Sequence, residues 1–112
     1  MTNKRIAIPA TAIGIFVWLV YYMTLWPTVS SGDSGELITM AYRTGVSHPP
    51  GYPLYTMLGK LFSFIPFGSV AWRINLLSAT LGAAAAAILV LIVYDWTKNI
   101  WAGSVAAILF AF

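Results

Sequence analysis

The chain has 112 residues, of which 60% are hydrophobic and only 8% are charged, and its formal net charge is +3. Soluble domains are closer to half apolar, so this composition excludes an ordinary soluble domain. The six basic residues are scattered along the chain, which excludes the clustered basic surface that nucleic-acid binding requires. Cysteine is absent, so the chain has neither a disulfide framework nor a thiolate metal site.

The first apolar run extends from Ile6 to Trp26 without a charged residue. At ~1.5 Å per helical residue it is long enough for the ~30 Å hydrocarbon core of a bilayer. Lys4 and Arg5 precede this run and Pro27 ends it. A cleaved signal peptide is the alternative, but its apolar region is only ~7–15 residues long and small residues follow it. Residues 6–26 are therefore predicted to form an uncleaved membrane span.

A polar segment from Gly32 to Tyr55 follows this span. It contains two of the chain's three acidic residues, Asp33 and Glu36, and its only histidine, His48. Because charged residues are rare elsewhere, we expect the chemistry of the protein to lie in this segment.

The start of the polar segment has the pattern of a short helix. Asp33 followed three residues later by Glu36 matches a capping box, in which the Asp oxygen accepts a first-turn N–H and the Glu side chain reaches back. Gly45 can adopt φ > 0 and end the helix. Residues 34–44 are therefore predicted to form a helix along the membrane surface. Its weakly polar face would comprise Leu37, Met40, Ala41 and Thr44.

The sequence HPPG at residues 48–51 cannot be helical, because proline keeps the residue before it out of the α region. Pro50-Gly51 suits the centre of a type II turn, and Pro53 suits the first position of a new helix. Apolar residues then repeat at helical spacing up to Ile65, with Lys60 among the polar ones. We predict an amphipathic interfacial helix over 53–65, because the run is too short to span a bilayer.

Residues 74–94 carry no charge and are predicted to form a second span. The DWTKN sequence at 95–99 reads as a tight polar turn. Residues 100–112 then begin a third apolar run, which covers only ~20 Å of helix and is too short to span. These lengths predict an all-α polytopic membrane protein, of which the chain would be the amino-terminal part. Residues 27–73 would form the loop between the first two spans.

Basic residues decide the expected orientation only weakly. With two complete spans, each side of the membrane carries three basic residues. The first span usually dominates, and Lys4 and Arg5 flank it directly. We therefore expect the amino terminus in the cytoplasm and residues 27–73 outside it, in a multi-pass protein of a bacterial inner membrane.

Three stretches resemble a known family when they are taken together: GDSGEL (32–37), GVSHPPGYPLY (45–55) and FGSVAWRINLLSA (67–79). They are similar to the amino-terminal part of a domain-of-unknown-function family of multi-span membrane proteins. That family is itself similar to the protein O-mannosyltransferases among the GT-C glycosyltransferases. The resemblance implies an extracytoplasmic first loop with membrane-parallel helices. It also implies an acidic residue after the first span, where a lipid-phosphate sugar meets its acceptor, and Asp33 occupies that position.

The residues themselves leave two roles open for Asp33. It could be a catalytic base that takes a proton from an acceptor hydroxyl, or a helix cap that Glu36 completes. The roles are compatible, because a carboxylate has two oxygens. The resemblance favours catalysis for Asp33, whereas Glu36, the second catalytic candidate, has the more structural pattern.

His48 could orient the acceptor, contact the donor phosphate, or ligate a divalent metal together with Asp33 and Glu36. The alternative is a hydrogen-bonded packing residue. No metal-ligand spacing supports a metal site. Because the rigid HPPG turn fixes where His48 points, we expect it near the substrate.

Arg43, Lys60 and Arg73 are candidates for binding the donor phosphate, since fixed cations stabilise a departing phosphate. The alternative is that they anchor the chain at the interface. Tyr52 and Tyr55 could stack on a sugar, although tyrosine is common at membrane interfaces.

These observations predict a GT-C glycosyltransferase that moves a sugar such as mannose from a polyprenyl-phosphate carrier to a protein or glycan hydroxyl. No cofactor is assigned besides the lipid-linked sugar donor, and a divalent metal is an option. This stretch alone would be inactive. A transporter or channel component is one alternative. Transporters usually place charges within their spans, whereas both predicted spans of this chain are free of charge. A non-catalytic membrane scaffold is the other.

Overall fold

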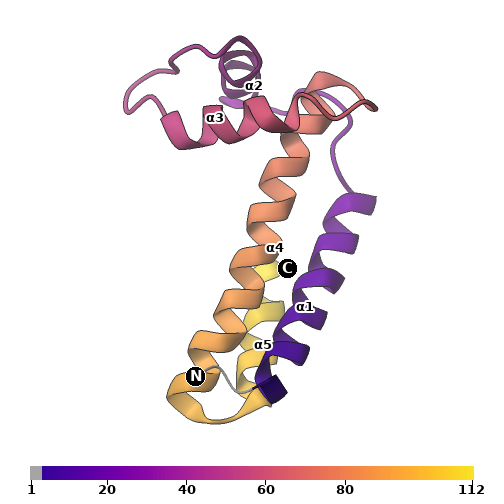
Figure 1. Ribbon diagram of the computed structural model, residues 1–112, viewed down its shortest axis with the longest axis vertical. Coiled ribbons are helices and arrows are strands. Elements are labelled where there is room, and N and C mark those ends of the chain that lie inside the picture. Colours follow the sequence, from indigo (N-terminus) through magenta and orange to yellow (C-terminus); the bar gives the residue numbers. More distant parts are fainter. Residues whose placement is uncertain (1–3) are drawn as a thin grey trace. The chain divides into compact units, whose positions relative to one another are not determined.

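The computed structural model describes residues 4–112, and in that range it contains helices and no strand (Figure 1). This confirms the predicted all-α class. The helices are α1 (Lys4–Met23), α2 (Ser34–Arg43), α3 (Pro53–Phe62), α4 (Val70–Thr97) and α5 (Ile100–Ala111). They form two compact units. One comprises residues up to 24 together with those from 79 on, and the other comprises residues 25–78.

Two of the described helices, α1 with 20 residues and α4 with 28, are long and apolar enough to cross a membrane. Helix α5 is also apolar but has only 12 residues. The number of helices long and apolar enough to cross a membrane therefore agrees with the two complete spans that the sequence predicts.

The first unit is held together by small residues that let α5 and α1 approach α4 closely. A Cβ built on Gly14 would lie 2.9 Å from the Cβ of Ala87, and one built on Gly103 would lie 2.7 Å from the carbonyl oxygen of Val90. Glycine at these positions therefore sets the helix spacing, as small residues do between membrane helices. The buried cluster consists of Ala10, Val17, Ala83, Ala86, Val90 and Ala107.

Both spans differ from their predicted limits at the polar ends. Helix α1 stops at Met23 rather than Trp26, since Pro27 keeps Trp26 out of the α region. Helix α4 starts at Val70 rather than at residue 74, because Ser69 Oγ accepts the backbone N–H of Trp72 and caps the helix.

The predicted turn at 95–99 is wrong in its first three residues, because α4 continues through Thr97. The reversal is confined to Lys98, which has a φ of 54°, and Asn99. The Asn99 side chain accepts the N–H groups of Trp101 and Ala102 and so caps α5.

In the second unit, α2, α3 and the first turns of α4 surround a small apolar core. Its buried residues are Ile38, Ala41, Ala71 and Ile74. A Cβ built on Gly59 of α3 would lie 2.7 Å from the Cβ of Ala41 in α2. The backbone of α3 at Gly59 therefore packs directly against the Ala41 side chain of α2, and only glycine leaves room for this contact.

The limits of the two short helices are close to the prediction. Helix α3 starts at Pro53, as predicted, but ends at Phe62, three residues before Ile65. Helix α2 ends at Arg43, and the residue that adopts the left-handed conformation is Thr44, with a φ of 56°, rather than Gly45. The predicted stop at Gly45 is therefore wrong by one residue.

Candidate functional site

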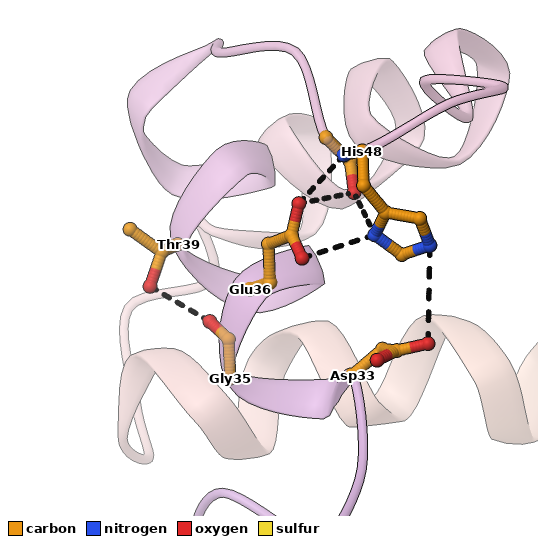
Figure 2. A network of polar contacts seen from close by, with 6 residues as sticks. Asp33, Gly35, Glu36, Thr39 and His48 are labelled. Carbon is orange, nitrogen blue, oxygen red and sulfur yellow. Dashed lines mark hydrogen bonds and ion pairs between the residues drawn. The ribbon is translucent and has the colours of Figure 1, made fainter.

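Three titratable side chains that the sequence singled out, Asp33, Glu36 and His48, lie together in the second unit (Figure 2). We call them the carboxylate–histidine cluster. Asp33 and Glu36 lie at the start of α2, and His48 lies in the segment between α2 and α3. The cluster therefore joins residues that are 12 to 15 positions apart in the chain.

Glu36 is the centre of the cluster. Its Oε1 accepts the backbone N–H of His48 at 2.6 Å and the hydroxyl of Ser47 at 2.9 Å, while its Oε2 lies 3.0 Å from Nδ1 of His48. The backbone bond from His48, followed by the ring and Ser47 bonds, lowers the pKa of Glu36 below its usual value. Glu36 therefore ties the first turn of α2 to residues 47 and 48 as an ionised carboxylate.

The capping box predicted for Asp33 and Glu36 is wrong. Asp33 precedes α2 with φ −77° and ψ 3°, and its side chain makes no capping hydrogen bond. A residue whose side chain caps a helix typically has φ and ψ angles in the extended region, and Asp33 lies outside that region. The carboxylate of Glu36 is bound to Ser47 and His48 instead of reaching back. Ser47 is buried and was missed, because a serine carries no distinguishing pattern before its contact is known.

The HPPG sequence places His48 through a tight turn. The N–H of Gly51 donates to the carbonyl of His48 at 2.7 Å, so Pro49 and Pro50 occupy the centre of the turn. The peptide bond between them is cis, which makes this a type VI turn rather than the predicted type II turn centred on Pro50-Gly51.

The imidazole of His48 lies between the two carboxylates. Its Nδ1 contacts Glu36, and its Nε2 lies 3.9 Å from Oδ2 of Asp33. The ring of Tyr52 meets the imidazole edge to face at 5.6 Å between centroids. The side chain of His48 is 38% exposed and that of Asp33 is 71% exposed, so solvent and a substrate can both reach this side of the cluster.

The arginines predicted to bind phosphate lie outside the cluster. Arg73 Nε donates to the carbonyls of Phe67 and Gly68, and its Nη1 donates to that of Ser63, so it fixes the connection between α3 and α4. Arg43 is exposed in the last turn of α2, about 15 Å of helix away from Asp33. Phosphate binding by either arginine stays a prediction.

The other two polar candidates also have local partners. Lys60 Nζ donates to the carbonyl of Tyr42 at 2.6 Å and lies over the Tyr42 ring. Tyr55 shares a hydrogen bond with Ser78 at 3.1 Å. Within residues 4–112, no three His, Cys, Asp or Glu side chains are grouped so that they could hold a metal ion, and a divalent metal stays a prediction.

The comparisons with known proteins agree with the predicted resemblance. Residues 33–112 match the family model of the protein O-mannosyl-transferase TMEM260 N-terminal domain. The chain is 48% identical over 97 residues to protein O-mannosyl-transferase tmem260 of Dictyostelium discoideum, an alignment that covers 84% of this chain and 12% of that protein. It is 45% identical over 104 residues to protein O-mannosyl-transferase TMEM260 of Mus musculus, covering 92% of this chain and 15% of that protein.

The chain thus spans only 12% and 15% of the length of these two relatives. Both relatives are eukaryotic, so neither supports the bacterial inner membrane that the sequence led us to expect. No solved structure matches the chain at a significant level. With the matched residues beginning at Asp33 and containing the whole carboxylate–histidine cluster, the chain belongs to the family of the protein O-mannosyl-transferase TMEM260 N-terminal domain.

Proposed function

We propose that the chain forms the amino-terminal part of a membrane glycosyltransferase of GT-C type. The enzyme would transfer mannose from a polyprenyl-phosphate carrier to a hydroxyl of a protein acceptor. Family membership and the names of the two relatives support transfer of mannose to protein. A lipid-linked donor is consistent with two helices long and apolar enough to cross a membrane.

In this proposal Asp33 is the catalytic base. As the acceptor oxygen attacks the anomeric carbon, its O–H bond breaks and the proton moves to the Asp33 carboxylate. The bond between the anomeric carbon and the phosphate oxygen breaks, and its electron pair leaves with the phosphate. Since phosphate is already a good leaving group, no second carboxylic acid is required to protonate it.

The observation that carries this proposal is that the Asp33 side chain is 71% exposed and makes no capping hydrogen bond. Its one close contact with another titratable side chain among the described residues is the 3.9 Å approach to Nε2 of His48. A carboxylate with no structural hydrogen bond can accept a proton without loosening the fold.

The experiment compares Asp33→Asn with the wild type in the complete enzyme, of which this chain is proposed to be the amino-terminal part, in membranes that contain equal amounts of each. Asparagine has the same shape but cannot accept a proton near neutral pH, so transfer of radiolabelled mannose from its polyprenyl phosphate should fall ~10²–10⁴-fold. Asp95→Asn is the matched control, because Asp95 is another exposed aspartate and pairs with Lys98, outside the carboxylate–histidine cluster. It should leave transfer unchanged. Retention of more than about half of the wild-type transfer by Asp33→Asn would show that Asp33 is not the base.

A further inference from the structure

His48 links the proposed base to a second carboxylate that the proposed reaction does not use. Nδ1 of the imidazole lies 3.0 Å from Oε2 of Glu36, and Nε2 on the other side of the ring lies 3.9 Å from Oδ2 of Asp33 (Figure 2). The same Glu36 carboxylate also accepts the His48 backbone N–H, so both the ring and its attachment point are held by one side chain.

The contacts of Glu36 determine which nitrogen of the neutral ring carries the proton. An ionised carboxylate only accepts hydrogen bonds, and the pKa of Glu36 is lowered by its bonds to His48 and Ser47. Ser47 gives its hydroxyl proton to Oε1 and therefore has none for the ring. Nδ1 must then be the donor to Oε2. The neutral imidazole consequently presents a lone pair at Nε2, on the side of Asp33.

A lone pair at Nε2 can accept a hydrogen bond from protonated Asp33 but not from ionised Asp33. An ionised Asp33 also presents only lone pairs, so the two groups cannot share a hydrogen bond. Once Asp33 has taken up a proton, its O–H can donate to Nε2. The present 3.9 Å separation is longer than a hydrogen bond, but the exposed Asp33 side chain can turn to close it, as catalytic contacts often do when substrate binds.

We propose that His48 is a positioning residue for Asp33: held by Glu36 with its proton on Nδ1, it accepts a hydrogen bond from Asp33 only when Asp33 receives the proton of the acceptor hydroxyl. This inference rests on the proposed role of Asp33 as the base. A bond that forms only as the proton arrives stabilises the transition state more than the bound substrates. It therefore raises kcat and leaves KM unchanged.

Glu36→Gln tests this arrangement with little change of shape. The backbone N–H of His48 can only donate, so the oxygen of the introduced amide must face it. The amide NH₂ then faces Nδ1 and donates to it, which moves the ring proton to Nε2. Nε2–H would bond to ionised Asp33 and make it a weaker base. The same logic applies to a catalytic histidine whose orienting carboxylate is replaced by an amide.

The first measurement is the ¹⁵N spectrum of histidine-labelled chain in lipid nanodiscs. His48 is the only histidine of the 112 residues, so it alone contributes ring signals. At a pH where the ring is neutral, the wild-type protein should show a protonated Nδ1 and a bare Nε2, and Glu36→Gln should show the reverse. A wild-type proton on Nε2, or a spectrum that Glu36→Gln leaves unchanged, would overturn the inference.

The second measurement is the kinetics of mannose transfer by the complete enzyme in membranes. Glu36→Gln should lower kcat about 10- to 100-fold, because the Nε2–H of His48 would then form a hydrogen bond to the charged Asp33 carboxylate that is lost when Asp33 takes up the proton, while KM for donor and acceptor stays the same. Thr39→Ala is the matched control, because Thr39 lies exposed on the same helix and its hydroxyl donates to the Gly35 carbonyl within α2. It should behave like the wild-type protein. A kcat for Glu36→Gln within twofold of this control would overturn the inference.

The two proposals can fail separately. If Asp33→Asn abolishes transfer but Glu36→Gln does not lower kcat, Asp33 remains the base and His48 does not assist it. If Asp33→Asn leaves transfer intact, the proposed base is wrong. The positioning role then fails with it, even where the spectrum shows the expected ring proton.

Discussion

Glu36 illustrates how much one side chain can change when its partners are known. Its spacing from Asp33 matches a capping box, yet its carboxylate binds Ser47 and His48. Three hydrogen bonds to one carboxylate stabilise its ionised form and lower its pKa. Glu36 therefore links α2 to the HPPG turn, whereas a capping glutamate would bond only within its own helix.

The lowered pKa of Glu36 predicts a pH dependence of stability. Its unfolded value is 4.5, and the folded value lies below that. The contribution of Glu36 is therefore complete above pH 4.5 and is lost as the pH falls through the folded pKa. Thermal unfolding followed by circular dichroism should show the wild-type protein more stable than Glu36→Gln at about pH 6, with the difference shrinking as the pH falls below 4.5 through the folded pKa. A constant difference between the two proteins over this range would contradict the prediction.

Among the helices, α3 shows an arrangement opposite to that of a helix in a soluble protein. Its buried positions are small or polar, namely Thr56 and Gly59. Three of its large apolar side chains, Leu54, Met57 and Leu61, are between 64% and 70% accessible. An exposed apolar stripe is typical of a helix that lies against lipid, and the interfacial position of α3 stays a prediction.

The contact between α2 and α3 predicts a large effect for a small substitution. Gly59→Ala would place a methyl group 2.7 Å from the Cβ of Ala41, so the helices must separate. We expect a loss of about 1–3 kcal/mol in the free energy of unfolding, measured by denaturant titration. Gly35→Ala is the control, because its Cβ would make only an ordinary 3.4 Å contact with Val29. Equal stability of the two variants would show that the α2–α3 contact is looser than described.

At the scale of the whole molecule, two helices of sufficient length and apolar character, α1 and α4, agree with a membrane protein. The segment between them, residues 24–69, contains the whole carboxylate–histidine cluster. The side of the membrane that this segment faces decides which donor and acceptor can reach Asp33.

The orientation can be tested by labelling, because the chain has no cysteine of its own. Val46 is 82% exposed and contacts none of the cluster, so Val46→Cys should react with an impermeant maleimide added to the non-cytoplasmic side. Thr97→Cys, at the end of α4, should react only after the membrane is permeabilised. This outcome follows from Lys4 and Arg5 before the first span. Labelling of Thr97→Cys alone in sealed membranes would reverse the orientation.

The sequence by itself determined the helical class, the two long apolar helices, the start of α3 at Pro53 and the identity of the polar segment. These features depend on composition, on periodicity and on the fixed φ of proline, all of which act within a few residues. The resemblance in GDSGEL and HPPGYPLY likewise identified the family, because motifs are read directly from the chain.

The tertiary structure alone decided what the polar residues do. The Asp33 side chain does not cap α2, Glu36 holds Ser47 and His48, and Arg73 binds backbone carbonyls. The partners of these side chains lie from 5 to 15 positions away in the chain, and folding brings them close. A carboxylate or guanidinium can satisfy its hydrogen bonds in many ways, and local spacing cannot rank them. Only the packing of α2, the HPPG turn and α4 selects among those partners.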